Sequence, residues 1–157
     1  MPKQSAGLLL FKKDDTGLQV LLVHPGGPFW RNKDKGSWTI PKGEFTGEED
    51  PLAAAKREFE EETGGPPPQG DYIPLKAIKQ KNGKTVHVWA VAGDFDSANL
   101  ISNTFLLEWP PKSGRKKEFP EVDRAAWFDP ETAKQKMLSG QPNLIDQLLA
   151  ILARVSI

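Results

Sequence analysis

Three glutamates, Glu58, Glu61 and Glu62, lie close together in a segment of good helix formers. Helix positions three and four apart are neighbours, so these carboxylates would share a strip about 100° wide. Each close pair of like charges costs about 0.2–0.5 kcal/mol on an exposed helix, and more where water is excluded. Glu62 would also lie near the negative end of the helix dipole, which disfavours an acid. A divalent cation would turn this repulsion into attraction, and clustered hard oxygen donors suit Mg²⁺ or Mn²⁺.

The helix that would carry these acids has a recognisable start and end. Asp50 is a suitable N-cap residue, and Pro51 fits the first helical position, where no backbone donor is needed. Gly64 and Gly65 can adopt the left-handed conformation that ends a helix. The pattern therefore predicts a helix from Pro51 to these glycines, with an apolar side formed by Leu52, Ala55 and Phe59.

A solvated acidic face is the alternative interpretation, with Lys56 and Arg57 neutralising part of the charge. The sequence around the helix favours a site instead. A glycine-containing loop, residues 42–44, lies just upstream, and the acids keep a fixed spacing beside Arg57. The spaced positions are Gly43, Glu49, Arg57, Glu58, Phe59, Glu61, Glu62 and Gly64.

This spacing resembles the signature of the Nudix hydrolases and departs from it at the final apolar position, which is Gly65. The resemblance implies an α/β/α sandwich, in which a mixed sheet carries helices on both faces. It also implies hydrolysis of a pyrophosphate bond in a nucleoside diphosphate linked to another moiety. In this family the positions of Glu58, Glu61 and Glu62 bind divalent metal, and the backbone carbonyl that corresponds to Lys42 is a further ligand.

Two other residues acquire roles through the same resemblance. Arg57 would orient Glu49 or Glu58 through an ion pair. Glu49 would hold the loop onto the helix, with metal binding as its alternative role. Many family members add a carboxylate six residues before a Trp, and Glu121 stands six residues before Trp127. We therefore predict that Glu121 is a further metal ligand or the base for the attacking water. Glu118 and Glu108 compete for this role, and an exposed loop acid is the plain alternative.

Substrate contacts are predicted where aromatic and basic residues stand together, because this mixture suits a base stacked beside a phosphate chain. The first such loop, residues 25–36, contains Phe29, Lys33 and Lys35, and the second, residues 110–120, contains Lys116. The predicted contacts are Trp30, Arg31, Trp38, Lys42, Arg115 and Lys117. For Trp38 the alternative is packing in the core, and for the second loop it is a solvated surface.

The remaining sequence indicates strands and helices that interleave without βαβ regularity, consistent with one α/β (α+β) domain over residues 1–157. The last helix has an apolar stripe that would dock on the sheet or pair with another chain, so a monomer and a homodimer both remain open. Predicted strands are residues 5–12, 18–24, 72–79, 84–92, 104–109 and 123–128, with a turn at Asn82 and Gly83 and helices from Pro130 to about Leu138 and over 142–155.

Composition narrows the functional classes. The 157 residues contain 21 basic and 21 acidic side chains, so net charge gives no indication of bulk binding to nucleic acid or membranes. Cysteine is absent, which excludes disulfides and thiolate metal sites and is compatible with a cytoplasmic location. No signal sequence and no membrane span is indicated.

The prediction is therefore a Mg²⁺-dependent pyrophosphohydrolase whose partner is a small nucleotide. Residues 120–128 and the basic loop before them resemble the asymmetric diadenosine polyphosphate hydrolases within this family. Nucleoside triphosphates, nucleotide sugars and 5′-triphosphorylated RNA ends are alternative substrates. A nucleotide sensor without turnover, or a structural protein with an acidic helix, are the alternatives to an enzyme.

Overall fold

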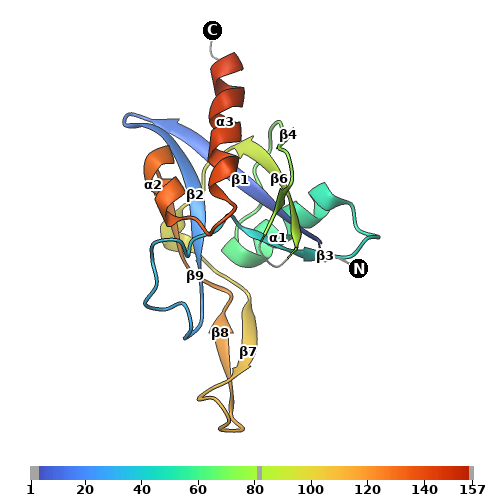
Figure 1. The fold of residues 1–157 in the computed structure, drawn as a ribbon, viewed down its shortest axis with the longest axis vertical. Helices are drawn as coiled ribbons and strands as arrows, with labels where there is room; N and C mark the ends of the chain where they lie inside the picture. Colours follow the sequence, from blue (N-terminus) through green and yellow to red (C-terminus); the bar gives the residue numbers. More distant parts are fainter. Residues whose placement is uncertain (1–3, 81–82, 156–157) are drawn as a thin grey trace.

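The computed structural model describes residues 4–80 and 83–155 and contains one large sheet with helices on both faces (Figure 1). The seven strands of this sheet have the order β4-β6-β1-β2-β9, with β3 paired to β1 and β5 paired to β6. Only the pair β1–β6 is parallel, so the sheet is mixed as the sequence predicts. The strands are β1 (Gln4–Asp14), β2 (Gly17–Pro25), β3 (Lys42–Phe45), β4 (Ile73–Pro74), β5 (Ile78–Lys79), β6 (Thr85–Ala92) and β9 (Val122–Phe128).

The sequence of strand β1 is a continuous apolar run and not an alternation of apolar and polar residues, and the surroundings of the strand explain this pattern. Successive side chains of a strand point to opposite faces of the sheet. Leu8 and Leu10 pack in the cluster of helix α1 (Pro51–Thr63), whereas Leu9 packs in the cluster of helices α2 (Pro130–Lys136) and α3 (Pro142–Val155). Both faces are therefore buried, and the α/β/α arrangement is confirmed.

Helix α1 begins and ends where the sequence predicts. The side chain of Asp50 accepts a hydrogen bond of 3.0 Å from the backbone N–H of Ala53, and Pro51 occupies the first helical turn. Gly64 adopts a left-handed conformation with φ of 79°, and its N–H donates to the carbonyl of Glu60 over 2.8 Å. Both ends of the helix are fixed by local chemistry, so its acidic strip has a defined position.

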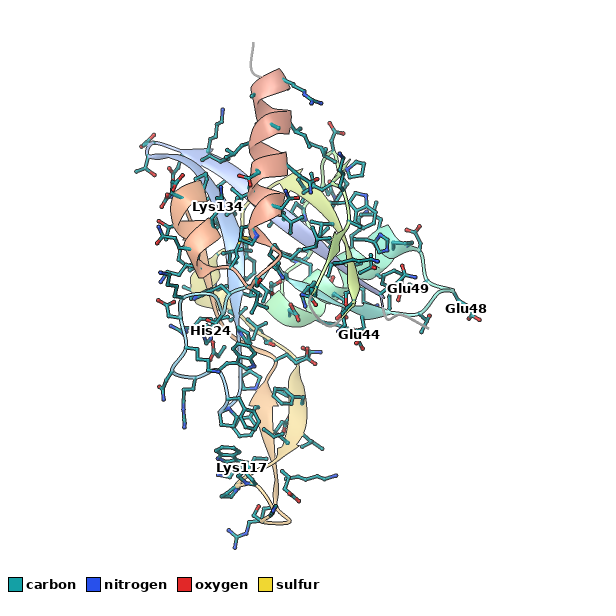
Figure 2. All side chains as sticks on the ribbon, in the orientation of Figure 1. His24, Glu44, Glu48, Glu49, Lys117 and Lys134 are labelled. Carbon is teal, nitrogen blue, oxygen red and sulfur yellow. The ribbon has the colours of Figure 1, made fainter. Side chains whose placement is uncertain are left out.

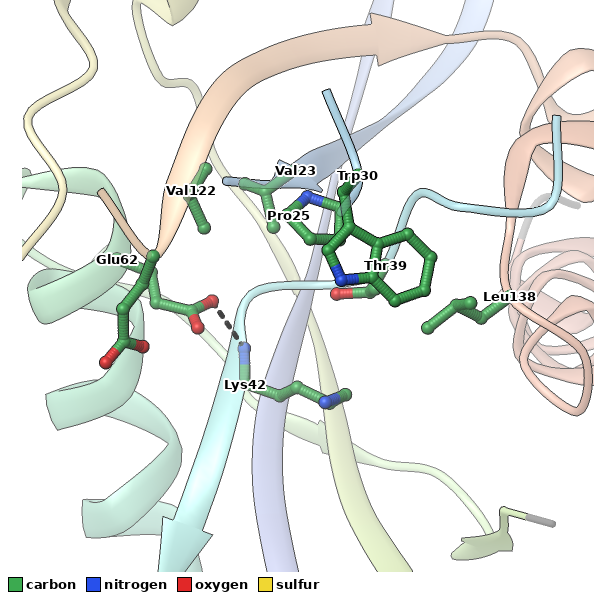
Figure 3. A pocket seen from close by; sticks show the side chains of 9 residues that line it. Val23, Pro25, Trp30, Thr39, Lys42, Glu62, Val122 and Leu138 are labelled. Atoms are coloured by element: carbon green, nitrogen blue, oxygen red, sulfur yellow. Dashed lines mark hydrogen bonds between the residues drawn. The ribbon is translucent and has the colours of Figure 1, made fainter. Parts of the chain in front are cut away.

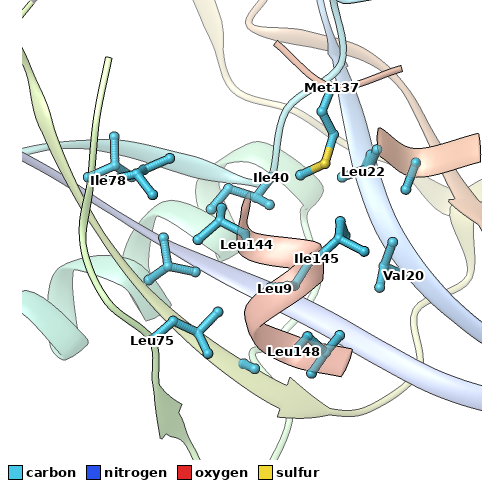
Figure 4. Close-up of a cluster of buried hydrophobic side chains, with 14 of the residues drawn as sticks. Leu9, Val20, Leu22, Ile40, Leu75, Ile78, Met137, Leu144, Ile145 and Leu148 are labelled. Atoms are coloured by element: carbon cyan, nitrogen blue, oxygen red, sulfur yellow. The ribbon is translucent and has the colours of Figure 1, made fainter. Parts of the chain in front are cut away.

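Helix α3 docks on the sheet within the same chain. Leu144, Ile145 and Leu148 are fully buried in the cluster on that face, while Leu149 is 40% exposed (Figure 4). Leu152 packs at the edge of the same cluster. The predicted stripe also included Val155, whose side chain lies outside the described part of the structure.

Two details differ from the predictions, and a third lies outside the described residues. Residues 110–120 are not one loop, because Lys116–Pro120 forms strand β8, which pairs with strand β7 (Thr104–Glu108) in a two-stranded hairpin. The predicted strand over residues 72–79 is interrupted, and only β4 and β5 pair with β6. Asn82, in the predicted turn, lies outside the described residues.

The remaining short elements complete the path of the chain. A 3₁₀ turn, η1 (Ser97–Asn99), lies in the connection between β6 and β7. None of the helices in the described part of the chain has the length and apolar character that a bilayer span requires.

Candidate active site

Arg57 holds the acidic residues of α1 in a compact network. Its guanidinium donates two hydrogen bonds of 2.9 Å to the carboxylate of Glu49 and one of 2.8 Å to Glu58. The same group lies 3.3 Å from both carboxylate oxygens of Glu61, one turn further along the helix. Arg57 therefore pairs with both of the acids that the resemblance indicated, and Glu49 ties the loop before the helix to the helix itself.

Gly43 lies directly against this network. A Cβ atom at this position would come within 1.6 Å of the Oε1 atom of Glu58, so only glycine leaves room for the carboxylate. Strand β3, which contains Gly43, is held against β1 by the register of Ala6 with Gly43. Because Gly43 has no side chain, the carboxylate of the buried Glu58 can lie directly against strand β3.

Glu62 turns toward the strand rather than toward Arg57. Its Oε1 atom accepts a hydrogen bond of 3.0 Å from the backbone N–H of Lys42. Figure 3 shows this bond, with the Lys42 side chain extending away from Glu62 on the side of Trp30. The backbone segment that was predicted to supply a carbonyl ligand therefore lies beside the acidic helix.

A pocket opens next to these groups, with a volume of about 170 Å³. Glu62 and Glu121 lie on its acidic side, Lys42 contributes a cation, and Trp30 faces them with the apolar side chains around it (Figure 3). The full lining is Val23, Pro25, Trp30, Thr39, Lys42, Glu62, Glu121, Val122 and Leu138. Acidic, basic and aromatic groups thus converge on one concave site, as a binding site for a charged aromatic ligand requires.

Burial and mutual repulsion perturb the acids. The pKa of Glu58 is raised to about 7, mainly by burial and also by the hydrogen bond and charge of Glu61, against the opposing effect of Arg57. Burial likewise raises the pKa of Glu62 to about 8, with the charges of Glu58 and Glu121 acting in the same direction. The pKa of Glu121 is raised by burial and by Glu61. The four acids therefore share one electrostatic field.

The combined charge of these acids shows whether a divalent cation would suit the site. In the described residues, no three acidic, His or Cys side chains are already gathered into a metal-binding group. Arg57 and the Lys42 N–H form hydrogen bonds with carboxylate oxygens of Glu58, Glu61 and Glu62. Glu58, Glu62 and Glu121, whose pKa values are raised, nevertheless form with Glu61 a donor set of hard oxygens, which is the kind that Mg²⁺ and Mn²⁺ prefer. The residues present fit a divalent cation.

We expect the stability of the protein without divalent cations to fall as pH rises from about 5 to about 8. Unfolded glutamates titrate near 4.3, whereas the pKa values of Glu58 and Glu62 in the fold are about 7 and 8. The folded state therefore binds more protons than the unfolded state across this window, so raising the pH destabilises it. Melting temperatures measured in a chelator should decrease, and added Mg²⁺ should restore more stability at pH 8 than at pH 6. Glu62→Gln should flatten this pH dependence, and a melting temperature that is constant with pH would contradict it.

The structure separates the predicted substrate contacts into two groups. Trp30 and Lys42 line the pocket, whereas Trp38 is 4% exposed and packs between His24 and Phe128. The placement of Trp38 thus favours the alternative of core packing. The exposed side chains of Arg31, Arg115 and Lys117 belong to the loop over residues 26–36 and to the β7–β8 hairpin and are not part of the pocket lining.

The three acids that were candidates for the additional ligand or base, Glu121, Glu118 and Glu108, lie in different places in the structure. Glu121 lines the pocket, while Glu118 accepts a short hydrogen bond from the hydroxyl of Thr104 on the hairpin. Glu108 accepts a hydrogen bond of 2.9 Å from the backbone N–H of Lys112. Of these three acids, Glu121 alone lies with the acidic strip.

His24 connects two segments that contribute residues to the pocket. Its ring is fully buried, with Nδ1 at 2.8 Å from the carboxylate of Asp123 and Nε2 at 2.6 Å from the carbonyl of Lys33. His24 thus ties the loop that contains Trp30 to strand β9, which follows Glu121. No motif in the sequence indicated this contact, since the partners lie 9 and 99 residues away.

A mixed sheet between helical layers, with an acidic helix beside a pocket, is the architecture of Nudix proteins. A model of the family described as NUDIX domain matches residues 1–148, and the chain belongs to this family. Family membership and the complete set of signature acids support a pyrophosphohydrolase.

Solved structures share this fold at low sequence identity. A C. elegans Ap4A hydrolase binary complex superposes with a TM-score of 0.67 and 20% identity, over 97% of this chain and 98% of that chain. The NUDIX domain of Shewanella oneidensis NrtR, complexed with ADP ribose, has a TM-score of 0.64 and 19% identity, over 97% of this chain and 89% of that chain. RenU, a Nudix hydrolase from M. smegmatis, has a TM-score of 0.59 and 19% identity, over 98% of this chain and 88% of that chain. A sequence comparison with curated proteins found no significant match.

Proposed function

We propose that the protein is a Mg²⁺-dependent hydrolase of nucleoside diphosphate derivatives, with dinucleoside polyphosphates as its substrates. One observation supports this proposal above the others. Glu62, at the end of the acidic strip, lines a pocket together with Glu121, and the same pocket is lined by the indole of Trp30 and by Lys42. A phosphate chain bound near the acids would therefore place an attached base against Trp30.

Each residue of the site has a role in this proposal. A bound divalent cation would neutralise the phosphate charge and favour ionisation of the attacking water. Glu58, Glu61, Glu62 and the carbonyl of Lys42 would hold that cation. Glu121 would complete the set or accept the proton of the attacking water, since it lines the pocket beside Glu62.

The positively charged groups have separate roles. Arg57 orients Glu58 and Glu61 and need not touch substrate, because its donors are directed at these carboxylates and at Glu49. The Lys42 side chain would contact the phosphate chain inside the pocket. Arg31, Arg115 and Lys117 would contact the part of the substrate that extends beyond the pocket.

The named substrate class draws on two further observations. The Ap4A hydrolase complex is among the solved structures that share this fold over nearly the whole of both chains. Trp30 also provides one stacking surface, and the exposed basic residues beside it extend away from the pocket. A second phosphate-linked nucleoside would lie in this direction.

A screen of nucleotide substrates with Mg²⁺ tests the proposal directly. We expect dinucleoside tetraphosphates to be turned over faster than nucleoside triphosphates and nucleotide sugars. Hydrolysis in ¹⁸O-labelled water would then identify the phosphorus that is attacked. Cation-dependent gain in thermal stability without turnover of any substrate would instead identify a nucleotide sensor, and no gain would identify a structural acidic helix.

We expect Trp30→Ala to raise KM for dinucleoside polyphosphates by at least about fivefold, with a smaller effect on kcat. Stacking of a base on an aromatic side chain contributes about 1–3 kcal/mol, and this contribution is made before the chemical step. Trp30→Phe keeps an aromatic ring and should retain most of the affinity. Steady-state kinetics with both variants would measure the effect, and an unchanged KM in Trp30→Ala would remove the indole from the substrate site.

A further inference from the structure

The positive charge of the chain is concentrated in two segments, residues 26–36 and residues 104–120, which we call the basic arm. Together these segments contain seven basic and three acidic side chains, although the whole chain is neutral. The rest of the molecule therefore has a surplus of four acidic residues. The basic side chains of the arm are all exposed: Arg31, Lys33, Lys35, Lys112, Arg115, Lys116 and Lys117.

These basic side chains are not neutralised by the acids of the arm. Asp34 pairs with Lys136 of helix α2 and accepts a hydrogen bond from the indole of Trp38. Glu118 and Glu108 accept hydrogen bonds from a hydroxyl and a backbone N–H. Within the described residues, none of the seven cations forms a salt bridge. Their charge is therefore available to an external anion.

The two segments pack together into one surface next to the pocket. Phe29 contacts Trp109 edge to face, with ring centroids 5.6 Å apart. A Cβ at Gly27 would meet the ring of Phe105 at 3.2 Å, and the N–H of Gly26 donates to the carbonyl of Glu121 over 2.9 Å. Figure 1 shows the β7–β8 hairpin projecting from the body of the protein, and Figure 2 places Lys117 on it among aromatic rings.

Aromatic rings accompany the cations along this surface. Phe29 is 60% exposed although it is a large apolar residue, and Trp30 continues the aromatic surface into the pocket. The ammonium group of Lys33 lies 5.2 Å from the centre of the Trp30 ring. Exposed rings beside spaced cations match the chemistry of unstacked bases and their phosphates.

The length of the arm exceeds what one nucleoside needs. A strand of five residues extends about 17 Å, and both strands of the hairpin have five residues. Charges distributed over this distance suit a polyanion with regularly spaced phosphates. An acidic peptide would use the cations but has no group that requires the exposed rings.

We propose that the basic arm binds single-stranded RNA, with the strand extending along the hairpin from a 5′ end near the pocket. The proposal rests on the proposed function only in taking the pocket as the phosphate site. Strand binding by the arm does not itself need hydrolysis, so an RNA with a 5′ hydroxyl group is a sufficient probe.

Fluorescence anisotropy with a labelled 5′-hydroxyl oligouridylate of about ten nucleotides tests the proposal at low salt. We expect Lys112→Glu/Lys116→Glu to weaken binding at least about tenfold and to reduce the dependence of log K on log salt concentration. Phe29→Ala should also weaken binding, but with an unchanged salt dependence. The matched control is Lys76→Glu/Lys79→Glu, which makes the same charge change at exposed lysines around β4 and β5 and should bind like the wild type.

Parallel assays separate this proposal from the proposed function. The kcat for hydrolysis of a dinucleoside tetraphosphate, measured at saturating substrate, should be unchanged in Lys112→Glu/Lys116→Glu, whereas Glu61→Gln should lose hydrolysis and keep RNA binding. No RNA binding by the wild type, or equal binding by both double variants, would overturn the proposal even if hydrolysis is found. Displacement of the RNA by polyglutamate at equal charge concentration would also overturn it and identify an acidic peptide site.

Discussion

Glu61→Gln should lower kcat by at least about 10²-fold while the protein remains folded. The substitution keeps the size of a partly exposed side chain but removes a negative charge that a divalent cation needs as its ligand. It also removes the charge that faces Arg57 at 3.3 Å, so the guanidinium is left with Glu49 and Glu58. Initial rates with a dinucleoside tetraphosphate over a range of Mg²⁺ concentrations would measure both the loss of rate and the weaker use of the cation.

Glu60→Gln is the matched control for this experiment. Glu60 is the preceding residue of the same helix and is exposed. Its substitution changes the charge of the helix by the same amount without reaching the acidic strip, so activity should stay within about twofold of the wild type, as for a surface change away from such features. Near-normal activity in folded Glu61→Gln would show that Glu61 is not a ligand, and an equal loss in Glu60→Gln would point to the general charge of the helix.

The second large effect is expected for Gly43→Ala. The new methyl group would lie 1.6 Å from the Oε1 atom of Glu58, and the Glu58 carboxylate is the part of the site that can move away. A displaced carboxylate would no longer be aligned with Arg57 or with the cation. We therefore expect kcat and the apparent affinity for Mg²⁺ to fall about 10–100-fold, as for other changes that misplace metal ligands.

The same substitution should have a smaller effect on folding. The atom in contact is the end of a flexible side chain rather than backbone, so the fold can accommodate the methyl group. Gly47→Ala is a suitable control in the same signature loop, because a Cβ there would meet no atom within 4 Å. Unfolding of Gly43→Ala under conditions where Gly47→Ala is stable would contradict the separation of function from folding. An active Gly43→Ala variant with normal use of Mg²⁺ would contradict the assigned position of Glu58.

The sequence predicts those parts of the molecule that depend on local chemistry. The limits of α1 follow from Asp50, Pro51 and Gly64, whose preferences are intrinsic to each residue. The burial of β1 on both faces follows from its continuous apolar run. The grouping of the four acids follows from helical spacing for three of them and from family resemblance for Glu121.

The parts that the sequence did not predict depend on contacts between distant segments. Lys116–Pro120 reads as a basic loop, but the pairing of Phe119 with Phe105 and the packing of residues 26–29 on the hairpin make it a strand. Which of Trp30 and Trp38 lines the pocket also depends on contacts between distant segments. Asp34 bonds the indole of Trp38 and pairs with Lys136, which fixes Trp38 in the core and leaves Trp30 at the pocket.

The buried ring of His24 has a consequence for how this protein would recognise its ligands. Because His24 links the carbonyl of Lys33 to Asp123, the loop that contains Trp30 and the start of strand β9 are anchored to one another through the interior. These contacts would hold the two segments in place before any ligand binds. Selection among nucleotides would therefore depend on the dimensions of a pocket that is formed before binding. The conformational entropy of the loop that contains Trp30 would be lost during folding rather than on binding.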